Sequence, residues 1–278
     1  MSRKRSEVGV SRRREGAQRR PRSGEPLQLR LPQGSRLIEG WNPVLEALRA
    51  GRRLQQVWLA ADQNKNAATL LELAREIGVP VTEVDRQQLS VLTGGDEHQG
   101  VAAAAPPYEY VGVDAILERA AARGEEPFLL LLDHIEDPQN LGSLIRTAEC
   151  AGVHGVVIPT RRAAGVTPAV GKASAGAIEY MPVARVTNLV QEMERLKERG
   201  LWVVGAHMEG ERSLFDADLR GPVALVIGAE GRGLSRLVAE RCDSRVYVPM
   251  WGRINSLNAS VAGALLMYEV ARSRSRIV

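Results

Sequence analysis

The sequence predicts an α/β protein with two domains, and three observations support this prediction. The chain has 278 residues, of which 44% are hydrophobic and 25% are charged, so it can fill two ordinary cores. Strand-sized apolar segments alternate with segments of helical periodicity, a pattern typical of parallel sheets covered by helices. This alternation is broken once, between residues 109 and 126. The break separates a small first domain from a larger second one.

Composition excludes several classes of protein. The longest apolar runs, such as Phe128–Leu132 and Val223–Ile227, are far shorter than the roughly 20 residues of a membrane span. The basic first residues lack the apolar core of a secretory signal. The two cysteines, Cys150 and Cys242, are far apart and have no metal-ligand spacing, which argues against a disulfide framework and a zinc site. We therefore expect a cytoplasmic protein without membrane contact and without a metal.

Residues 1–34 are predicted to form a disordered basic tail. Residues 1–36 contain 11 Lys and Arg residues but only 3 acidic residues, whereas the whole chain has a net charge of only +4. Polar residues, Gly and Pro dominate this stretch, and no apolar periodicity precedes Leu37. Such a tail suits phosphate contacts with RNA, and it is equally compatible with a role in solubility alone.

The first domain is predicted over residues 35–108. Asn42 followed by Pro43 is typical of a helix start, and this helix extends to Ala50. Two further helices and three strands are predicted in alternation: helices over 67–77 and 87–92, and strands over 57–60, 79–84 and 101–105.

A linker is predicted over 109–126, although its middle is mildly helical, and the second domain over 127–278. The second domain alternates more strongly, which predicts parallel strand pairing. In its first helix Arg146 lies off the face on which the apolar residues recur. Strands are predicted over 128–132, 155–158, 201–206, 223–228 and 245–248, and helices over 140–151, 188–199 and 257–272.

Three segments that follow strands of the second domain have residues suited to a functional site, because open parallel sheets build their sites at the carboxyl ends of their strands. The first, Asp133–Arg146, contains a proline turn, the polar Asn140 and Arg146. These polar residues are also suited to helix capping alone.

The second segment is Gly228–Gly233, directly after an apolar strand. Its glycines follow the pattern GxxGxG rather than the dinucleotide fingerprint GxGxxG, which disfavours a dehydrogenase. The stretch around Gly171 and Lys172 likewise misses the phosphate-loop pattern, so nothing supports ATP hydrolysis.

The third segment is Val248–Asn258, which leads into the last helix. Ser256 and Asn258 can be simple helix caps. The backbone at Val248, Met250 and Leu257, beside the glycine loop, suits a flat adenine ring.

Together, in this order, the three segments resemble the three motifs of the SpoU/TrmH family of RNA ribose methyltransferases, which belong to the SPOUT superfamily. The resemblance spans residues 127–272. The stretch from Leu37 to Leu48 and the stretch His98–Ala102 resemble the family's ribosomal-protein-like RNA-binding domain. The resemblance implies a C-terminal domain with a deep trefoil knot, S-adenosylmethionine as cofactor, and a homodimer whose active site uses both subunits.

The family's roles carry over to matching positions of this chain. The resemblance implies catalytic roles for Asn140, Arg146, Glu230, Ser256 and Asn258. It implies cofactor contacts at Ala206, Gly228, Gly231, Val248, Met250 and Leu257.

The resemblance favours methylation of a guanosine ribose in large-subunit (23S-type) ribosomal RNA. A tRNA ribose methyltransferase, a ribose methylase that confers antibiotic resistance, and a non-catalytic RNA-binding ribosome-assembly factor are the alternatives. Arg146 is better suited to act as a cation that stabilises a developing alkoxide than as a neutral base, because its pKa is too high for a base.

Overall fold

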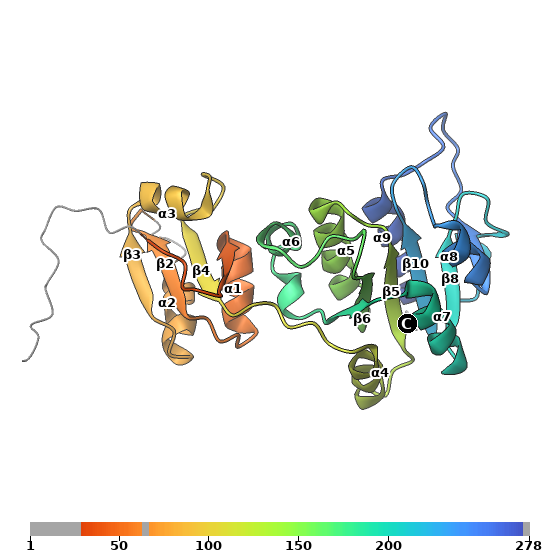
Figure 1. Cartoon of the computed structure of the whole chain (residues 1–278), viewed down its shortest axis with the longest axis horizontal. Coiled ribbons are helices and arrows are strands. Elements are labelled where there is room, and N and C mark those ends of the chain that lie inside the picture. The colour runs from red at the N-terminus through yellow and green to blue at the C-terminus, as the bar shows by residue number, and fades with distance from the viewer. Residues whose placement is uncertain (1–28, 63–66, 275–278) are drawn as a thin grey trace, which may run out of the picture.

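The structure is a computed structural model that describes residues 29–62 and 67–274. It contains two units that lie side by side (Figure 1), one around a four-stranded sheet and one around a seven-stranded sheet. Residues 1–28 of the predicted tail lie outside the described residues. Leu29 and Leu31 pack against the core of the first unit.

The sheet of the first unit has the order β1-β4-β2-β3, with β2 and β3 parallel and the other pairs antiparallel. Residues of β4 alternate between the two faces: Ala103 packs in the cluster with α1 and α2, and Ala104 in the cluster with α3. A central strand covered on both faces is buried along its whole length, and β4 reads VAAAA with every residue buried. The elements are β1 (Arg36–Glu39), α1 (Trp41–Arg49), β2 (Gln56–Ala60), α2 (Ala67–Glu76), β3 (Val81–Val84), α3 (Arg86–Thr93) and β4 (Val101–Ala105).

The sheet of the second unit has the order β7-β6-β5-β10-β8-β11-β9, and all of its pairings are parallel. This confirms the parallel pairing that the alternating sequence predicts. The strands are β5 (Phe128–Asp133), β6 (Gly155–Pro159), β7 (Val183–Val186), β8 (Trp202–Ala206), β9 (Arg212–Ser213), β10 (Val223–Gly228) and β11 (Ser244–Tyr247).

Helices cover both faces of this sheet (Figure 1). One core cluster joins Leu130 of β5 to α5, α6 and α9, and the other joins Leu129 of β5 to α4, α7 and α8. The strand therefore sends alternate side chains into two apolar layers. The helices are α4 (Val113–Ala122), α5 (Pro138–Cys150), α6 (Pro168–Ala173), α7 (Leu189–Glu198), α8 (Arg236–Arg241) and α9 (Ala259–Arg274), with short 3-10 turns η1 (Ala177–Glu179) and η2 (Leu214–Asp216).

Several elements differ from the sequence-based expectations. Helix α5 starts at Pro138 instead of Asn140, because Asp137 caps it by accepting a hydrogen bond from the backbone N–H of Gln139 at 3.0 Å. Helix α9 starts at Ala259, two residues later than predicted. The segment predicted as a linker contains α4, whose Val113 and Ile116 are buried against the second sheet.

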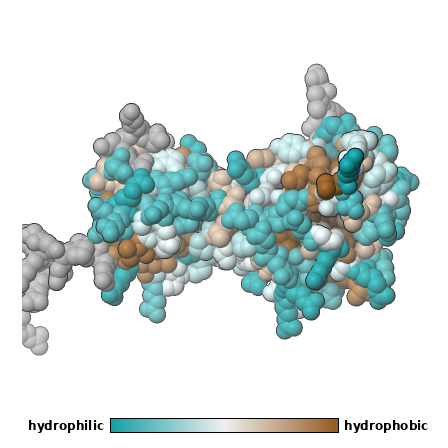
Figure 2. Space-filling model, turned by 90° about the horizontal axis from the view of Figure 1, so that it is seen from above, coloured by the Kyte–Doolittle hydropathy of each residue, from teal (hydrophilic) through white to brown (hydrophobic). Residues whose placement is uncertain are grey.

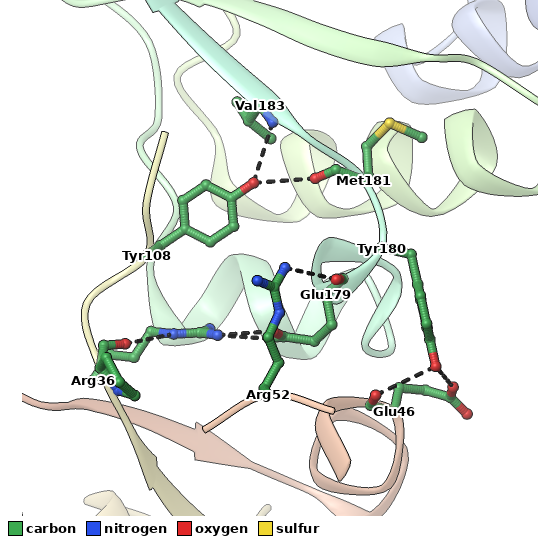
Figure 3. A network of polar contacts seen from close by, with 9 residues as sticks. Arg36, Glu46, Arg52, Tyr108, Glu179, Tyr180, Met181 and Val183 are labelled. Atoms are coloured by element: carbon green, nitrogen blue, oxygen red, sulfur yellow. Dashed lines mark hydrogen bonds and ion pairs between the residues drawn. The ribbon is translucent and has the colours of Figure 1, made fainter. Parts of the chain in front are cut away.

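A buried carboxylate joins the two units (Figure 3). Glu179 of η1, whose side chain is only 2% exposed, pairs with Arg36 and Arg52 of the first unit at 2.8 and 3.1 Å. Arg52 also donates to the backbone carbonyl of Glu179 at 2.7 Å. These contacts set the position of the first unit beside α5 and α6.

Within the described residues, no helix is both long enough and apolar enough to cross a membrane.

Candidate active site

The three segments singled out in the sequence follow neighbouring strands. Strands β5, β10, β8 and β11 are adjacent in the sheet and parallel, so their carboxyl ends lie along one edge. Open α/β sheets bind ligands at this edge. The fold therefore gathers residues that are up to 118 positions apart in the chain, such as Asn140 and Asn258.

Three of the predicted catalytic residues are joined by hydrogen bonds. The side-chain amide of Asn258 donates to the Oδ1 atom of Asn140 and to the Oε2 atom of Glu230, each at 3.0 Å. Asn140 lies in the first turn of α5, Glu230 lies in the loop after β10, and Asn258 precedes α9. One residue from each of the three segments thus takes part in a single cluster.

Asn258 also caps α9. Its Oδ1 atom accepts hydrogen bonds from the backbone N–H of Ser260 at 2.9 Å and from the Ser260 hydroxyl at 2.6 Å. The capping role considered for Asn258 is therefore present together with the link to Asn140 and Glu230, because an amide has an acceptor end and a donor end.

The glycine loop after β10 is tightly folded on itself. A Cβ atom at Gly228 would lie 2.1 Å from the backbone carbon of Gly233, so only glycine fits there. Gly231 has a φ of 74°, a left-handed conformation that favours glycine. The far end of the loop is anchored by Asp133 at the end of β5, whose carboxylate accepts from the backbone N–H of Ser235 at 2.6 Å.

The other predicted cofactor residues lie on β8 and in the segment between β11 and α9. Ala206 ends β8 and Val248 follows β11; both are half-buried and pack against the core that supports α5 and α9. Met250 is exposed and Leu257 is half-buried. Ala206 and Val248 lie at the carboxyl ends of the adjacent strands β8 and β11. Apolar residues at this edge of the sheet suit the adenine and ribose part of a nucleoside cofactor.

Arg146 and Ser256 are not part of the hydrogen-bonded cluster. Arg146 is exposed on α5, six residues beyond Asn140, and lines a groove between the two units. Within the part of the chain that the structure describes, no hydrogen bond or ion pair is formed by its guanidinium. Ser256 is exposed in the loop before α9.

Two further functional candidates emerge from the structure that the sequence alone does not single out. Asp133 is almost fully buried, which is unusual for an acid, and its position at the end of an apolar strand was the available signal. Glu46 of α1 lines the same groove as Arg146. No local pattern distinguishes Glu46 from an ordinary surface residue of a helix.

Comparisons with known proteins match both units. Residues 127–268 match the SpoU rRNA Methylase family, and residues 37–111 match the family described as RNA 2′-O ribose methyltransferase substrate binding. The putative TrmH family tRNA/rRNA methyltransferase YacO of Bacillus subtilis is 48% identical over 86% of this chain and 96% of its own length. A putative TrmH family tRNA/rRNA methyltransferase of Staphylococcus saprophyticus is 43% identical over 87% of this chain and 97% of its own length.

Solved structures are similar over both units. The SpoU methyltransferase AviRb of Streptomyces viridochromogenes, in complex with the cofactor AdoMet, has a TM-score of 0.72 and 28% sequence identity, and the match covers 87% of this chain and 91% of that chain. A structure described as an RNA 2′-O ribose methyltransferase has a TM-score of 0.71 and 28% identity over 87% of this chain and 90% of that chain.

Proposed function

Because the chain belongs to the SpoU rRNA methylase family, we propose that it methylates the ribose 2′-hydroxyl of a guanosine in large-subunit (23S-type) ribosomal RNA. As a member of this family it is an S-adenosylmethionine-dependent RNA methyltransferase. The single observation that carries the proposal is the cluster of Asn140, Glu230 and Asn258, which joins all three motif segments at the ligand-binding edge of the sheet.

The reaction is a displacement at carbon. S-adenosylmethionine supplies an electrophilic methyl group, and the ribose oxygen forms a bond to that carbon as the bond from carbon to sulfur breaks. Holding the hydroxyl in line with that bond can lower the activation free energy by roughly 7 to 11 kcal/mol. The residues of the chain therefore act mainly by positioning, and the hydroxyl proton leaves to water or to a phosphate oxygen.

Arg146 is proposed to stabilise the negative charge that develops on the ribose oxygen and to bind an adjacent phosphate. Its guanidinium is exposed on α5 and has no competing partner among the described residues. On α5, Arg146 lines the groove between the two units together with Glu149 and Cys150, which lie one turn further along the helix.

Glu230 is proposed to order the glycine loop. Its carboxylate accepts from Asn258, which fits a role in holding the loop against α9. A carboxylate facing the sulfonium would stabilise the ground state, because the positive charge of the sulfonium disappears in the transition state. Ser256 is assigned to the same site by its place in the third segment.

The cofactor is proposed to bind at Ala206, Gly228, Gly231, Val248, Met250 and Leu257.

We also propose that the second unit contains the deep trefoil knot, and that the chain forms the homodimer, which the resemblance implies. Hydrophobic residues gather on one face of the second unit (Figure 2). On α9, Val261, Leu265 and Tyr268 are large, exposed apolar residues at helical spacing, which is the kind of stripe that a second copy of the chain would cover.

Two other functions fit the same fold. A tRNA substrate agrees with the names of the relatives, which read tRNA/rRNA methyltransferase. A non-catalytic assembly factor would keep the fold but would not need the intact set of Asn140, Arg146, Glu230 and Asn258. The match of residues 37–111 to a substrate-binding family supports an RNA substrate. Of the two RNAs, rRNA is the one proposed, with the cytoplasm as the place of the reaction.

Mapping of 2′-O-methylated riboses tests this proposal. RNA from a strain that lacks the protein should lose one methylated guanosine in large-subunit rRNA, and adding the gene back should restore it. Loss of a methyl group from tRNA would replace the rRNA assignment, and an unchanged map of both RNAs would rule out the enzymatic function. Calorimetry should show that S-adenosylmethionine binds in the presence of a chelator.

A further inference from the structure

A groove of about 540 Å³ lies between the two units. This volume is in the range of small-ligand sites. Both units contribute to its walls: α1 of the first unit, and α5 together with the turn between α6 and β7 of the second. The lining residues are Asn42, Glu46, Arg146, Glu149, Cys150, Ser174, Ala175, Ala177 and Tyr180.

The carboxylate of Glu46 is held in one orientation at this groove (Figure 3). Its Oε2 atom accepts a hydrogen bond from the Tyr180 hydroxyl at 2.8 Å. Its Oε1 atom accepts a hydrogen bond from Arg49, on the same helix, at 2.7 Å. Burial, followed by the bond to Glu46, raises the pKa of Tyr180 to about 12. The tyrosine therefore stays a donor at neutral pH, and each carboxylate oxygen keeps a lone pair for another donor.

The charges around the groove select which part of a nucleotide can enter. Glu46 and Glu149 both line the groove and repel phosphate, whereas Arg146 attracts it. An oriented carboxylate binds a group with adjacent N–H donors. Among the RNA bases, guanine has two such donors side by side, N1–H and the 2-amino group, and unpaired bases of RNA are commonly read through this edge.

We propose that the groove receives the guanine base of the acceptor nucleotide, that Glu46 binds its N1–H and 2-amino groups, and that Arg146 faces the attached ribose and phosphate. Tyr180 is a positioning residue that orients Glu46. This inference rests on the proposed function, since it requires an RNA acceptor, and it adds the residue that selects the base. An acceptor guanosine must leave its base stack to reach the groove.

The test compares guanosine with inosine, which lacks the 2-amino group. The substrate is large-subunit rRNA transcribed in vitro and ligated so that the mapped acceptor position carries either guanosine or inosine. For the wild-type chain, inosine should lower kcat/KM for methylation by about 10- to 100-fold, because a donor to a charged acceptor is lost.

Glu46→Gln should lower kcat/KM on guanosine RNA by a similar factor, and its remaining preference for guanosine over inosine should be less than about threefold. Tyr180→Phe should reduce the guanosine preference in part. Both variants should keep the wild-type thermal unfolding temperature and affinity for S-adenosylmethionine. Glu149→Gln is the matched control, because it removes the same charge from the same groove, and it should keep the full guanosine preference.

Equal use of guanosine and inosine by the wild-type chain, an unchanged preference in Glu46→Gln, or an acceptor other than guanosine would each overturn the role of Glu46. In the first two cases the chain still methylates a guanosine, so the proposed function stands. In the third case the guanosine assignment of the proposed function fails as well, and only RNA ribose methylation stands. If the wild-type chain methylates neither RNA and no ribose is lost from the map, the proposed function fails and the groove proposal fails with it.

Discussion

At the residue scale, Asn258 shows that a helix cap and a site residue can be the same side chain. Its oxygen accepts from Ser260 while its nitrogen donates to Asn140 and Glu230. A sequence pattern predicts the cap, because Asn is favoured before a helix. It does not predict the two other partners, which come from segments 118 and 28 residues away.

Arg146 is the residue whose replacement should affect the chemical step most. Arg146→Ala removes the charge and the planar donor group, and loss of one preorganised charge-stabilising donor typically lowers turnover by about 100- to 1,000-fold. Arg146→Lys keeps the charge but not the bidentate geometry, so it should recover only part of the rate. Single-turnover methylation under saturating S-adenosylmethionine measures this effect.

Both Arg146 variants should remain folded and bind S-adenosylmethionine with nearly wild-type affinity, because Arg146 is exposed and outside the glycine loop. Near wild-type turnover of the alanine variant would show that Arg146 is an ordinary surface residue of α5 and that the acceptor ribose lies elsewhere.

His154 should make the stability of the protein depend on pH. It is only 1% exposed, accepts from the backbone N–H of Phe128 and contacts Glu125 at 2.8 Å. Burial lowers its pKa below the usual 6.5, although Glu125 opposes this. The unfolded chain then binds a proton before the folded chain does, so the stabilisation is complete above the unfolded pKa and is lost as the pH falls through the folded pKa.

Urea unfolding at about pH 7.5 and about pH 5.5 checks this prediction. The wild-type chain should be less stable at the lower pH, and His154→Gln should lose less stability between the two values. Burial also lowers the pKa of His98 in the first unit, so some pH dependence should remain in the variant. Identical pH dependence in the two chains would contradict the assignment to His154.

At the element scale, the loop after β10 depends on the close approach of its two ends. Gly228→Ala would place a Cβ atom 2.1 to 2.4 Å from backbone atoms of Gly233 and Leu234, so the loop must move. Overpacking of this kind typically destabilises by about 1 to 3 kcal/mol. The expected result is a lower unfolding temperature together with weaker binding of S-adenosylmethionine in calorimetry.

Gly221→Ala is the matched control for Gly228→Ala. Gly221 lies just before β10, has no positive φ, and a Cβ atom there would meet nothing within 4 Å. It should bind S-adenosylmethionine like the wild-type chain. Equal binding by both variants would place the cofactor away from the glycine loop.

Long apolar elements could be predicted from the sequence, whereas several of the short elements could not. The runs that became β5 and β10 are continuous and apolar because both faces of a parallel sheet are buried. In contrast, β7 has four residues and α6 has six, too few to show a period. Helix α4 falls in the segment predicted as a linker because Gly112 and Gly124 flank it, and only the middle of the segment has helical character in the sequence.

At the scale of the whole molecule, the relative position of the two units depends on contacts that no local pattern shows. Arg36 and Glu179 are 143 residues apart, and each resembles a surface residue in the sequence. The motif segments could be predicted because they are contiguous and resemble those of a family. The groove between the units could not, because its walls meet only after both units have folded.

The ion pairs of Glu179 should stabilise the junction. Arg36→Met removes one of the two cations that face a carboxylate with 2% exposure. Leaving a buried charge without its partner typically lowers the free energy of unfolding by about 3 to 5 kcal/mol. Because Arg52 still pairs with Glu179 in this variant, we expect a loss at or below the lower end of that range. A lower urea midpoint and faster amide hydrogen exchange around Glu179 should be seen.

Arg86→Met is the control for the junction, because Arg86 pairs with Asp62 and both side chains are about half exposed. Exposed pairs contribute about 1 kcal/mol or less, so this variant should unfold like the wild-type chain. If Arg36→Met also unfolds like the wild-type chain, the pairs at Glu179 do not hold the two units together.

The position of β10 in the sheet has a consequence for synthesis on the ribosome. Strand β10 lies between β5 and β8, although it follows both of them in the chain. During synthesis, β5 leaves the exit tunnel before β10 does. The edge of β5 that pairs with β10 in the folded sheet therefore stays unpaired until residues 223–228 emerge. Open edges of this kind invite pairing with other chains. Ribosome stalling or premature termination before β10 would therefore release an aggregation-prone fragment rather than a smaller folded domain.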